Sequence, residues 1–408
     1  MAGLLIHNAR IITMDPQCPR ASALAIKEGR IQALGDSGSL LKPIDRKTEV
    51  LDLRGRTVLP GFFDAHVHFR AMAESQVTLN ISPEKGVTQI SRLQEWIYQE
   101  TLRHPLGTWI RAGGYDDTAL AEKRDPRRWD LDPVSPHHPL KLTHRSGQAH
   151  VLNSLALKQL NINRETPDPE GGLMERDLES GEPTGVFYGA GDFLAQQIPP
   201  LEEPLLNVGL QSADKELLRY GITAFQDASP RNDGERWQAF KKWKAKGWIR
   251  GSVVMMLGIR GFQELIQNPS FFSAAGPDLK TGGVKIKVDE FSGRLFPGEQ
   301  ELEALVFSIH RAGLQAVIHA IEEPAIEAAC LTIEKALKKI PRSDHRHRIE
   351  HCSVCPPSLA ERIASLGIMV VSHPAFVYFN GDRYLKTVPP PELRCLYPFK
   401  TLWRKGVS

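Results

Sequence analysis

The alternation of apolar and polar residues changes character along the chain. Residues 3–14, 22–35 and 48–60 alternate in short runs separated by glycine-containing turns, as strands of a half-buried sheet do. We interpret residues 1–56 as the N-terminal part of a small β-sandwich domain. A more continuously apolar strand at Thr57–Phe69 then begins a larger domain.

From about residue 206 onward, apolar strands alternate with amphipathic helices. Helical periodicity covers 206–219, 233–246, 298–312, 323–339 and 356–366. The strand segments read GITAFQDAS, WIRGSVVMML, GGVKIKVDEF, LQAVIHAI, HRIEHCS and GIMVVSHPAF. Buried strands that alternate with helices form parallel sheets. With the strand at 57–69 there are seven, which predicts an α/β fold: a (β/α)8 TIM-type barrel over 57–69 and 206–408 whose eighth strand is truncated.

Residues 70–205 follow neither pattern. They combine an amphipathic helix candidate at Ile90–Arg103 with turn-rich stretches such as residues 165–185. Structureless loops of this length are uncommon in compact domains. We therefore predict an inserted α+β subdomain that caps the substrate pocket.

Composition narrows the functional classes. The 408 residues are 41% hydrophobic and 24% charged, and 51 basic against 48 acidic residues give a formal net charge of +3. Such a balance favours neither a nucleic-acid nor a membrane partner. No apolar run approaches the ~20 residues of a membrane span, and the N-terminus lacks the features of a secretory signal. We expect a small-molecule substrate and a cytoplasmic location, and allow for a homodimer.

Residues 59–69, LPGFFDAHVHF, carry the strongest chemical signal. His66 and His68 lie two positions apart in a strand, so both imidazoles point to one side. Such a pair forms half of a divalent-metal site, although it also occurs in ordinary surface turns. His319 and His351 lie at the ends of later predicted strands, where barrel enzymes place catalytic groups. Together the four histidines predict a metal site.

Lys285 lies on the apolar strand GGVKIKVD, between these histidines in sequence. A lysine inside a barrel is costly unless it is paired or modified. Desolvation lowers the pKa of its amine, and the neutral amine reacts with CO2 to form a carbamate, an anionic ligand able to bridge two cations. The alternative is a surface lysine that shares its face with Lys287.

Four other residues are candidates for substrate contacts. His144 and His150 lie in the inserted segment, where hydrogen bonding to substrate and a solvated loop are both open. His373 ends the seventh strand and contacts either substrate or a metal ligand. Asp289, with Glu290 beside it, either contacts substrate or holds a loop.

Cys352 and Cys355 form a Cys-x-x-Cys motif, but no second pair completes a zinc site. A redox role would need a thioredoxin-like βαβ context around Cys352, whereas the sequence there supplies a barrel strand. We therefore favour two incidental thiols in a reducing compartment.

These motifs together resemble the amidohydrolase superfamily, and more closely its family 3 branch, which includes N-substituted formamide deformylase and exoenzyme-regulator-like proteins. The resemblance covers the whole chain and rests on PGFFDAHVH, SGQAHVLNSLAL, DPEGG, GEPTGV, GGVKIKVD, AVIHAI and RIEHC. The second and fourth of these segments separate this branch from dihydroorotases and adenosine deaminases.

The resemblance implies hydrolysis of an amide-type, non-peptide C–N bond by a metal-activated hydroxide. His66 and His68 would bind the more buried metal, and carbamylated Lys285 would bridge to a second. His319 and His351 would bind that second metal, so Lys285, His319 and His351 are the implied catalytic residues. One or two divalent ions are expected; these ligands suit Zn²⁺ best, with Fe²⁺, Mn²⁺ and Ni²⁺ as alternatives.

The chain departs from the family in two places. Glu322, Glu323 and Pro324 stand near the position of the family's Gly-Asp pair, and the family's eighth-strand aspartate, a metal ligand and general base, would lie beyond Ser408. The alternative to an active hydrolase is therefore a truncated, catalytically inactive homologue that retains metal or ligand binding. N-acyl amines, formamides, cyclic amides and carbamates all remain candidate substrates.

Overall fold

The computed structural model describes residues 3–41, 47–273, 276–291 and 294–408. The chain forms two compact units. The smaller unit comprises Met1–Phe63 and Gly221–Ala224, and the larger unit comprises Asp64–Tyr220 and Phe225–Ser408.

The smaller unit is built from short strands in two sheets. One sheet has the order β5 (Arg30–Gly35), β4 (Ala23–Lys27), β1 (Leu4–His7), β6 (Glu49–Asp52), and the other β3 (Arg20–Ala21), β2 (Arg10–Ile12), β7 (Thr57–Val58). Helix α1 (Ser37–Leu41) follows β5. Ala9, Ile11 and Leu24 form a small buried core, which agrees with the half-buried strands that the alternation predicts.

The larger unit contains most of the predicted barrel sheet. Its seven strands are adjacent in the order in which they occur along the chain, from β8 at one edge of the sheet to β22 at the other. They are β8 (Phe62–Val67), β15 (Ile222–Asp227), β16 (Ser252–Leu257), β17 (Leu279–Lys287), β20 (Ala316–Ala320), β21 (Arg348–His351) and β22 (Met369–Val371). The ladders that join β16, β17, β20, β21 and β22 are all parallel. The prediction of a seven-stranded parallel barrel sheet is confirmed.

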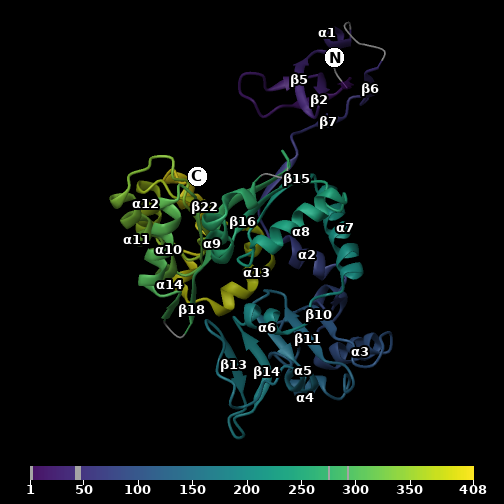
Figure 1. Cartoon of the computed structure of the whole chain (residues 1–408), viewed down its shortest axis with the longest axis vertical. Helices are drawn as coiled ribbons and strands as arrows, with labels where there is room; N and C mark the ends of the chain where they lie inside the picture. The colour runs from purple at the N-terminus through teal and green to yellow at the C-terminus, as the bar shows by residue number, and fades with distance from the viewer. Residues whose placement is uncertain (1–2, 42–46, 274–275, 292–293) are drawn as a thin grey trace. The chain divides into compact units, whose positions relative to one another are not determined.

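Helices follow the barrel strands and pack on the outside of the sheet (Figure 1). They are α7 (Glu203–Arg219), α8 (Gly234–Ala245), α9 (Ile259–Gln267), α10 (Glu299–Arg311), α11 (Glu323–Lys339) and α12 (Pro357–Ser365). In α11, a proline and a glutamate in the first turn and two lysines in the last turn favour a helix at both ends. Its apolar face shares a core with Ile286, Ile318 and Ile349 of the sheet.

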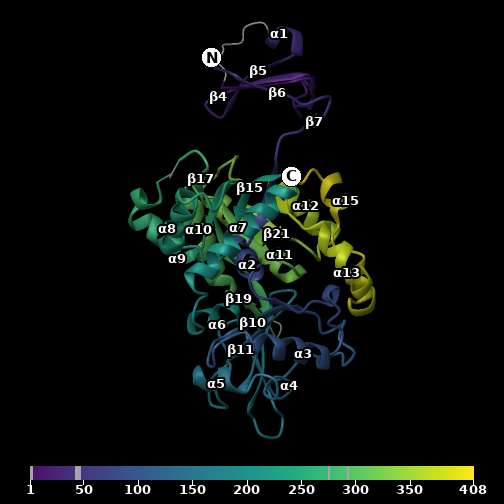
Figure 2. The ribbon, with the colours of Figure 1, turned by 90° about the vertical axis from the view of Figure 1, so that its right-hand side faces the viewer.

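The segment between β8 and β15 contains a second, six-stranded sheet with the order β13–β14–β12–β11–β10–β9. Its elements are α2 (Phe69–Ser75), β9 (Leu79–Asn80), η1 (Pro83–Lys85), α3 (Ile90–Thr101), β10 (Ile110–Tyr115), α4 (Arg128–Leu131), β11 (Leu140–His144), β12 (Ala149–Leu152), α5 (Ser154–Gln159), β13 (Leu173–Arg176), β14 (Pro183–Tyr188) and α6 (Gly191–Gln197). Leu142 and Val151 contribute to one apolar cluster, and Leu152 and Phe187 to another. The sheet lies against the barrel (Figure 2), and Arg231 after β15 pairs with Asp192 of α6 at 2.9 Å.

The larger unit contains further elements outside the two sheets and the helices named above. They are η2 (Pro269–Phe272), β18 (Asp289–Phe291), β19 (Arg294–Phe296), α13 (Pro374–Thr387), α14 (Pro390–Leu393) and α15 (Phe399–Arg404). β18 and β19 pair antiparallel directly after the strand that carries Lys285. Within the described ranges, no helix combines the length and the apolar character that crossing a membrane requires.

Candidate metal centre

The first barrel strand directs two histidines to one side. His66 lies in β8 and His68 directly follows it, so the two share a face. The His66 ring contacts Glu350 of β21, which places it inside the curved sheet. The His68 Nδ1 lies 3.4 Å from the Ser229 hydroxyl, at the end of β15.

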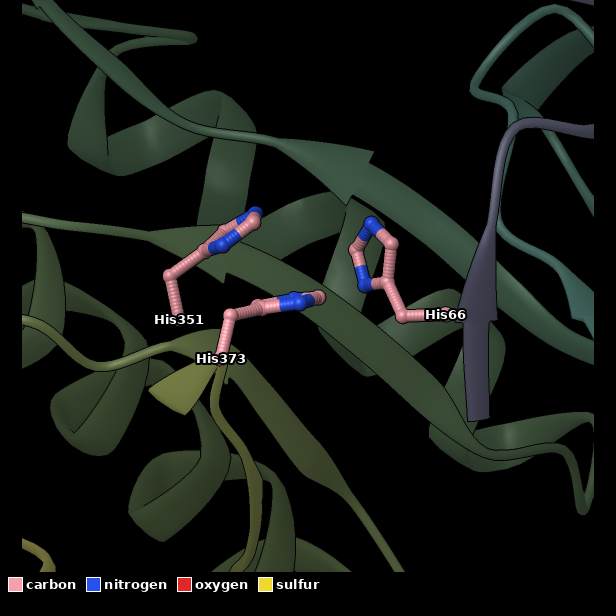
Figure 3. Close-up of side chains that lie close together, drawn as sticks. All are labelled: His66, His351 and His373. Atoms are coloured by element: carbon pink, nitrogen blue, oxygen red, sulfur yellow. The ribbon is translucent and has the colours of Figure 1, made fainter. Parts of the chain in front are cut away.

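Five histidines from four strand ends come together here, and Figure 3 shows three of them pointing toward one another. The His66 ring centroid lies 5.2 Å from His68, 5.1 Å from His351 and 4.9 Å from His373. The His351 ring lies 4.4 Å from His319. Ligand nitrogens of His66, His351 and His373 lie within 4.8 Å of one another, so one ion could contact all three. Because β8 and β22 are the edges of the sheet, the proximity of His66 and His373 means that the sheet nearly closes.

His351 reaches the cluster through an unusual backbone conformation. In β21, Glu350 faces the interior and Ile349 packs outward, so strict alternation would send His351 outward too. Its φ of 71°, followed by 49° at Cys352, breaks the alternation. Residues other than glycine rarely adopt such angles, and strain of this kind is concentrated at functional sites.

Lys285 lies in the barrel interior. Its register partner in β20 is Val317, two residues before His319. The lysine is 2% exposed, and its Nζ has no hydrogen-bond partner among the described residues. Burial, opposed by the Glu350 carboxylate, lowers the pKa of Lys285 to about 8. The alternative of a surface lysine is therefore wrong.

Glu350 is a site residue that the sequence analysis missed. Its carboxylate accepts hydrogen bonds from His66 Nδ1 and from Arg348 Nε. Arg348 also donates to the Gln226 side chain at 2.7 Å. Burial opposes the charge on Glu350, but the bond from His66 and the charge of Lys285 outweigh it and lower the pKa of Glu350 to about 2. The sequence did contain a signal for this residue, because Arg348 and Glu350 are two charged residues within an otherwise apolar barrel strand.

Burial favours the neutral form of four of the clustered imidazoles, those of His68, His319, His351 and His373. It lowers the pKa of both His68 and His373 to about 4, and electrostatic repulsion from the neighbouring His66 ring adds to the effect. Burial also lowers the pKa of His319 and of His351. Neutral imidazole is the form that binds metal. Nδ1 of His351 and Nε2 of His373 are buried without a hydrogen-bond partner in the part of the chain that the structure describes, which is unusual unless a ligand completes them.

The other predicted residues divide into two groups. Asp289 lies beside the cluster, where it pairs with Lys287 and its Oδ1 is 3.7 Å from His319 Nε2. His144 and His150 lie in the inserted sheet, on β11 and β12, and none of the ring contacts described above joins them to the cluster. They are 6% and 5% exposed, so the solvated-loop alternative is wrong for both.

His144 forms a second candidate group with Asp116 and Asp117, whose ligand atoms lie within 4.8 Å of one another. The Asp116 carboxylate already accepts hydrogen bonds from the Thr118 hydroxyl at 2.6 Å and from Arg145 at 2.8 Å. Protein donors already bind the Asp116 carboxylate, whereas the histidine cluster retains ring nitrogens without a partner among the described residues. The histidine cluster is therefore the stronger candidate for a metal site.

Cys352 and Cys355 are fully buried and reduced. The contact with Cys355, together with burial, raises the pKa of the Cys352 thiol. An inaccessible thiol of this kind is typical of a structural cysteine, in agreement with the incidental interpretation of the motif.

Comparison with known proteins gives the family. Residues 49–408 match the family 3 model of the amidohydrolase family. The chain belongs to the amidohydrolase family. This membership confirms the resemblance drawn from the sequence motifs.

The chain is 27% identical to the N-substituted formamide deformylase of Arthrobacter pascens over 416 residues. This alignment covers 94% of the chain and 75% of the relative. The chain is 26% identical to the putative amidohydrolase YtcJ of Bacillus subtilis, over 98% of this chain and 78% of the relative. An uncharacterized metal-dependent hydrolase from Pyrococcus furiosus is similar in structure, with a TM-score of 0.73 at 23% identity over 98% of this chain and 83% of the other. A second, from Pyrococcus horikoshii, gives 0.76 at 21% identity over 98% and 80%. These likenesses establish the fold.

Proposed function

We propose that this amidohydrolase is a metal-dependent enzyme that hydrolyses an amide-type, non-peptide C–N bond of a small molecule. The observation that carries the proposal is the convergence of histidines from separate strands inside the barrel that also buries Lys285, whose amine has no hydrogen-bond partner among the described residues. The names of similar proteins support it: one is an N-substituted formamide deformylase, and two are metal-dependent hydrolases.

The donor set fits a divalent cation. Clustered neutral imidazoles suit Zn²⁺ best, with Fe²⁺, Mn²⁺ and Ni²⁺ as alternatives. In this proposal His66 and His68 hold one ion, and His319 and His351 hold a second. His373, with its unpartnered Nε2, is a further candidate ligand. A divalent ion supplies Lewis acidity, which polarises a carbonyl and makes water a stronger nucleophile.

Lys285 joins the ligand set as a carbamate. Its lowered pKa increases the fraction of neutral amine, and the amine nitrogen then bonds to the carbon of CO2 and releases one proton. The product is an anionic oxygen ligand, which offsets the positive charge that a metal brings to the buried site. An unmodified lysine there would leave a buried amine without a partner.

The surrounding residues position the ligands and the substrate. Glu350 holds the His66 ring through Nδ1, which leaves Nε2 to face the site. Arg348 holds Glu350 in turn, so the orientation of His66 depends on a buried pair. Asp289, beside His319, contacts substrate in this proposal.

Metal analysis combined with an amine-release assay tests the proposal. Purified protein should contain up to two divalent ions and release amines from a panel of N-substituted formamides and N-acyl amines. His66→Ala should lose at least one ion and the activity, whereas His137→Ala, at an exposed position, should change neither. Equal metal content in wild type and His66→Ala would overturn the proposed site.

A further inference from the structure

A second group of unusual charges lies on the inserted sheet. Arg111 of β10 and Lys141 of β11 are register partners and therefore neighbours on one face. Thr143, two residues along β11, is paired with His150 of β12, so these two share that face. The face thus carries two cations and a buried imidazole side by side.

The side-chain amine of Lys141 has no hydrogen bond or ion pair to any residue in the described ranges, although the residue is partly buried. Burial, with Arg111 and Arg231 nearby, lowers the pKa of Lys141 to about 8. The carboxylate whose charge acts on it is Glu74, and Glu74 already accepts a bond from Arg70 at 2.7 Å. An amine held in such surroundings destabilises the protein unless an anion pairs with it.

His150 has an open donor position beside this lysine. It is 5% exposed, and its Nε2 has no hydrogen-bond partner among the described residues. The Thr143 hydroxyl lies 3.4 Å from Nδ1 and can donate to it, which leaves Nε2 to carry the proton. Lys141 and Arg231 are the strongest charges acting on the ring, and both are positive.

The neighbouring cations already have protein partners, and Arg111 donates to the Pro199 carbonyl. Arg231 pairs with Asp192 at 2.9 Å, and Lys287 pairs with Asp289. Ser229, whose hydroxyl lies 3.4 Å from His68 Nδ1 in the candidate metal centre, precedes Arg231 by two residues, so this group lies close to the candidate metal centre. Lys141 is therefore the cation on this face that most needs an external anion.

We propose that the substrate of this enzyme carries a carboxylate, which Lys141 binds by charge and His150 binds through Nε2–H, while Arg231, paired with Asp192, adds to the positive charge of the site. The inference rests on the proposed function, and it narrows the substrates to small amides that bear a carboxylate away from the scissile C–N bond. Charge-assisted hydrogen bonds from lysine and arginine are the usual means of binding such a group.

Calorimetric titration of the full-length protein tests this site by binding and not by turnover. The two probes are N-acetylglycine and N-acetylglycinamide, which differ in that a neutral carboxamide replaces the carboxylate. Wild type should bind the acid about tenfold more tightly or better. Lys141→Met should remove that preference and leave the affinity for the amide within about twofold. Lys158→Met, an exposed lysine on α5, is the matched control and should change neither affinity.

Three results would overturn the proposal: equal affinities of wild type for both probes, an equal loss for both probes in Lys141→Met, or tighter binding of inorganic phosphate than of the acid. If Lys141→Met does not fold, Arg231→Met, at a half-exposed position, should show the same selective loss. If the protein binds N-acetylglycine more tightly than N-acetylglycinamide but hydrolyses no amide, the proposed hydrolase function is wrong and the proposed carboxylate-binding site is retained.

Discussion

Two histidine clusters lie at opposite ends of the same barrel strand. His347 directly precedes β21 and contacts His310 and His345, while His351 ends β21 in the candidate metal centre. Both clusters are buried, and burial lowers the pKa of His347 to about 3, as it lowers that of His351. Residue type and burial therefore do not distinguish them.

Hydrogen bonding does distinguish them. The Ala316 N–H donates to His347 Nδ1, His347 Nε2 lies 2.8 Å from His310 Nδ1, and His310 Nε2 donates to the Ile340 carbonyl. His345 likewise bonds through both nitrogens. This set is complete with every ring neutral. In the candidate metal centre, a ring nitrogen of His351, one of His373 and the amine of Lys285 have no hydrogen-bond partner within the ranges that the structure describes. We infer that imidazoles whose two nitrogens both have hydrogen-bond partners in the protein are structural, whereas buried imidazoles with an unbonded nitrogen are candidates for binding a ligand.

The largest expected effect is the loss of activity in His351→Asn. Asparagine tolerates positive φ, so the variant should fold while losing a ligand. We expect amide hydrolysis to fall by about a hundredfold or more, with bound metal reduced. Steady-state kinetics and metal analysis measure both. An active His351→Asn variant with full metal content would contradict the inference that the His351 cluster binds metal and the His347 cluster is structural.

His347→Asn should have the opposite profile. Its loss leaves the Ala316 N–H and His310 Nδ1 unpartnered inside the protein, which should cost about 3 kcal/mol of unfolding free energy. Metal content should not change. Urea denaturation with metal analysis separates the two effects, and metal loss here would show that the two clusters are not independent.

Glu350→Gln should weaken metal binding about 10–100-fold, because the amide orients His66 less firmly than the carboxylate does. Competition with a chelator measures the affinity. Glu303→Gln removes a carboxylate that pairs with Lys335 and Lys339 outside the site, and it should have no effect. Equal affinity in Glu350→Gln and wild type would argue against the positioning role.

A further effect concerns acid stability. The pKa of His347 is about 3 in the folded protein and about 6.5 when unfolded, so the unfolded chain binds the proton first. Its contribution is present above pH ~6.5 and is lost as pH falls toward 3, at about 1.4 kcal/mol per pH unit. The difference in unfolding free energy between wild type and His347→Asn should therefore shrink between pH 7 and 4. A constant difference would mean that His347 is not buried as a neutral ring.

The sequence predicted the barrel well because each strand and helix repeats a local pattern. Predicted helices at 233–246 and 323–339 correspond to α8 and α11. Helix α9 was missed because it is short and only Gly258 separates it from β16. No side-chain cap marks the start of this helix.

The candidate site was only partly predictable. Strand alternation placed His66, His68 and Lys285, but it cannot predict the positive φ that turns His351 inward. Glu350 was missed because its partner His66 is 284 residues away in the sequence. The surroundings of Lys141 depend on Arg231 from a barrel loop, which no local pattern predicts.

Anomalous diffraction at the metal absorption edge, on crystals grown with Zn²⁺, tests the central claim most directly. We predict anomalous density about 2.1 Å from imidazole nitrogens of His66, His68, His319 or His351. The Lys285 side chain should also show the forked extension of a carbamate. Density confined to the Asp116, Asp117 and His144 group, or none at the histidine cluster, would contradict it.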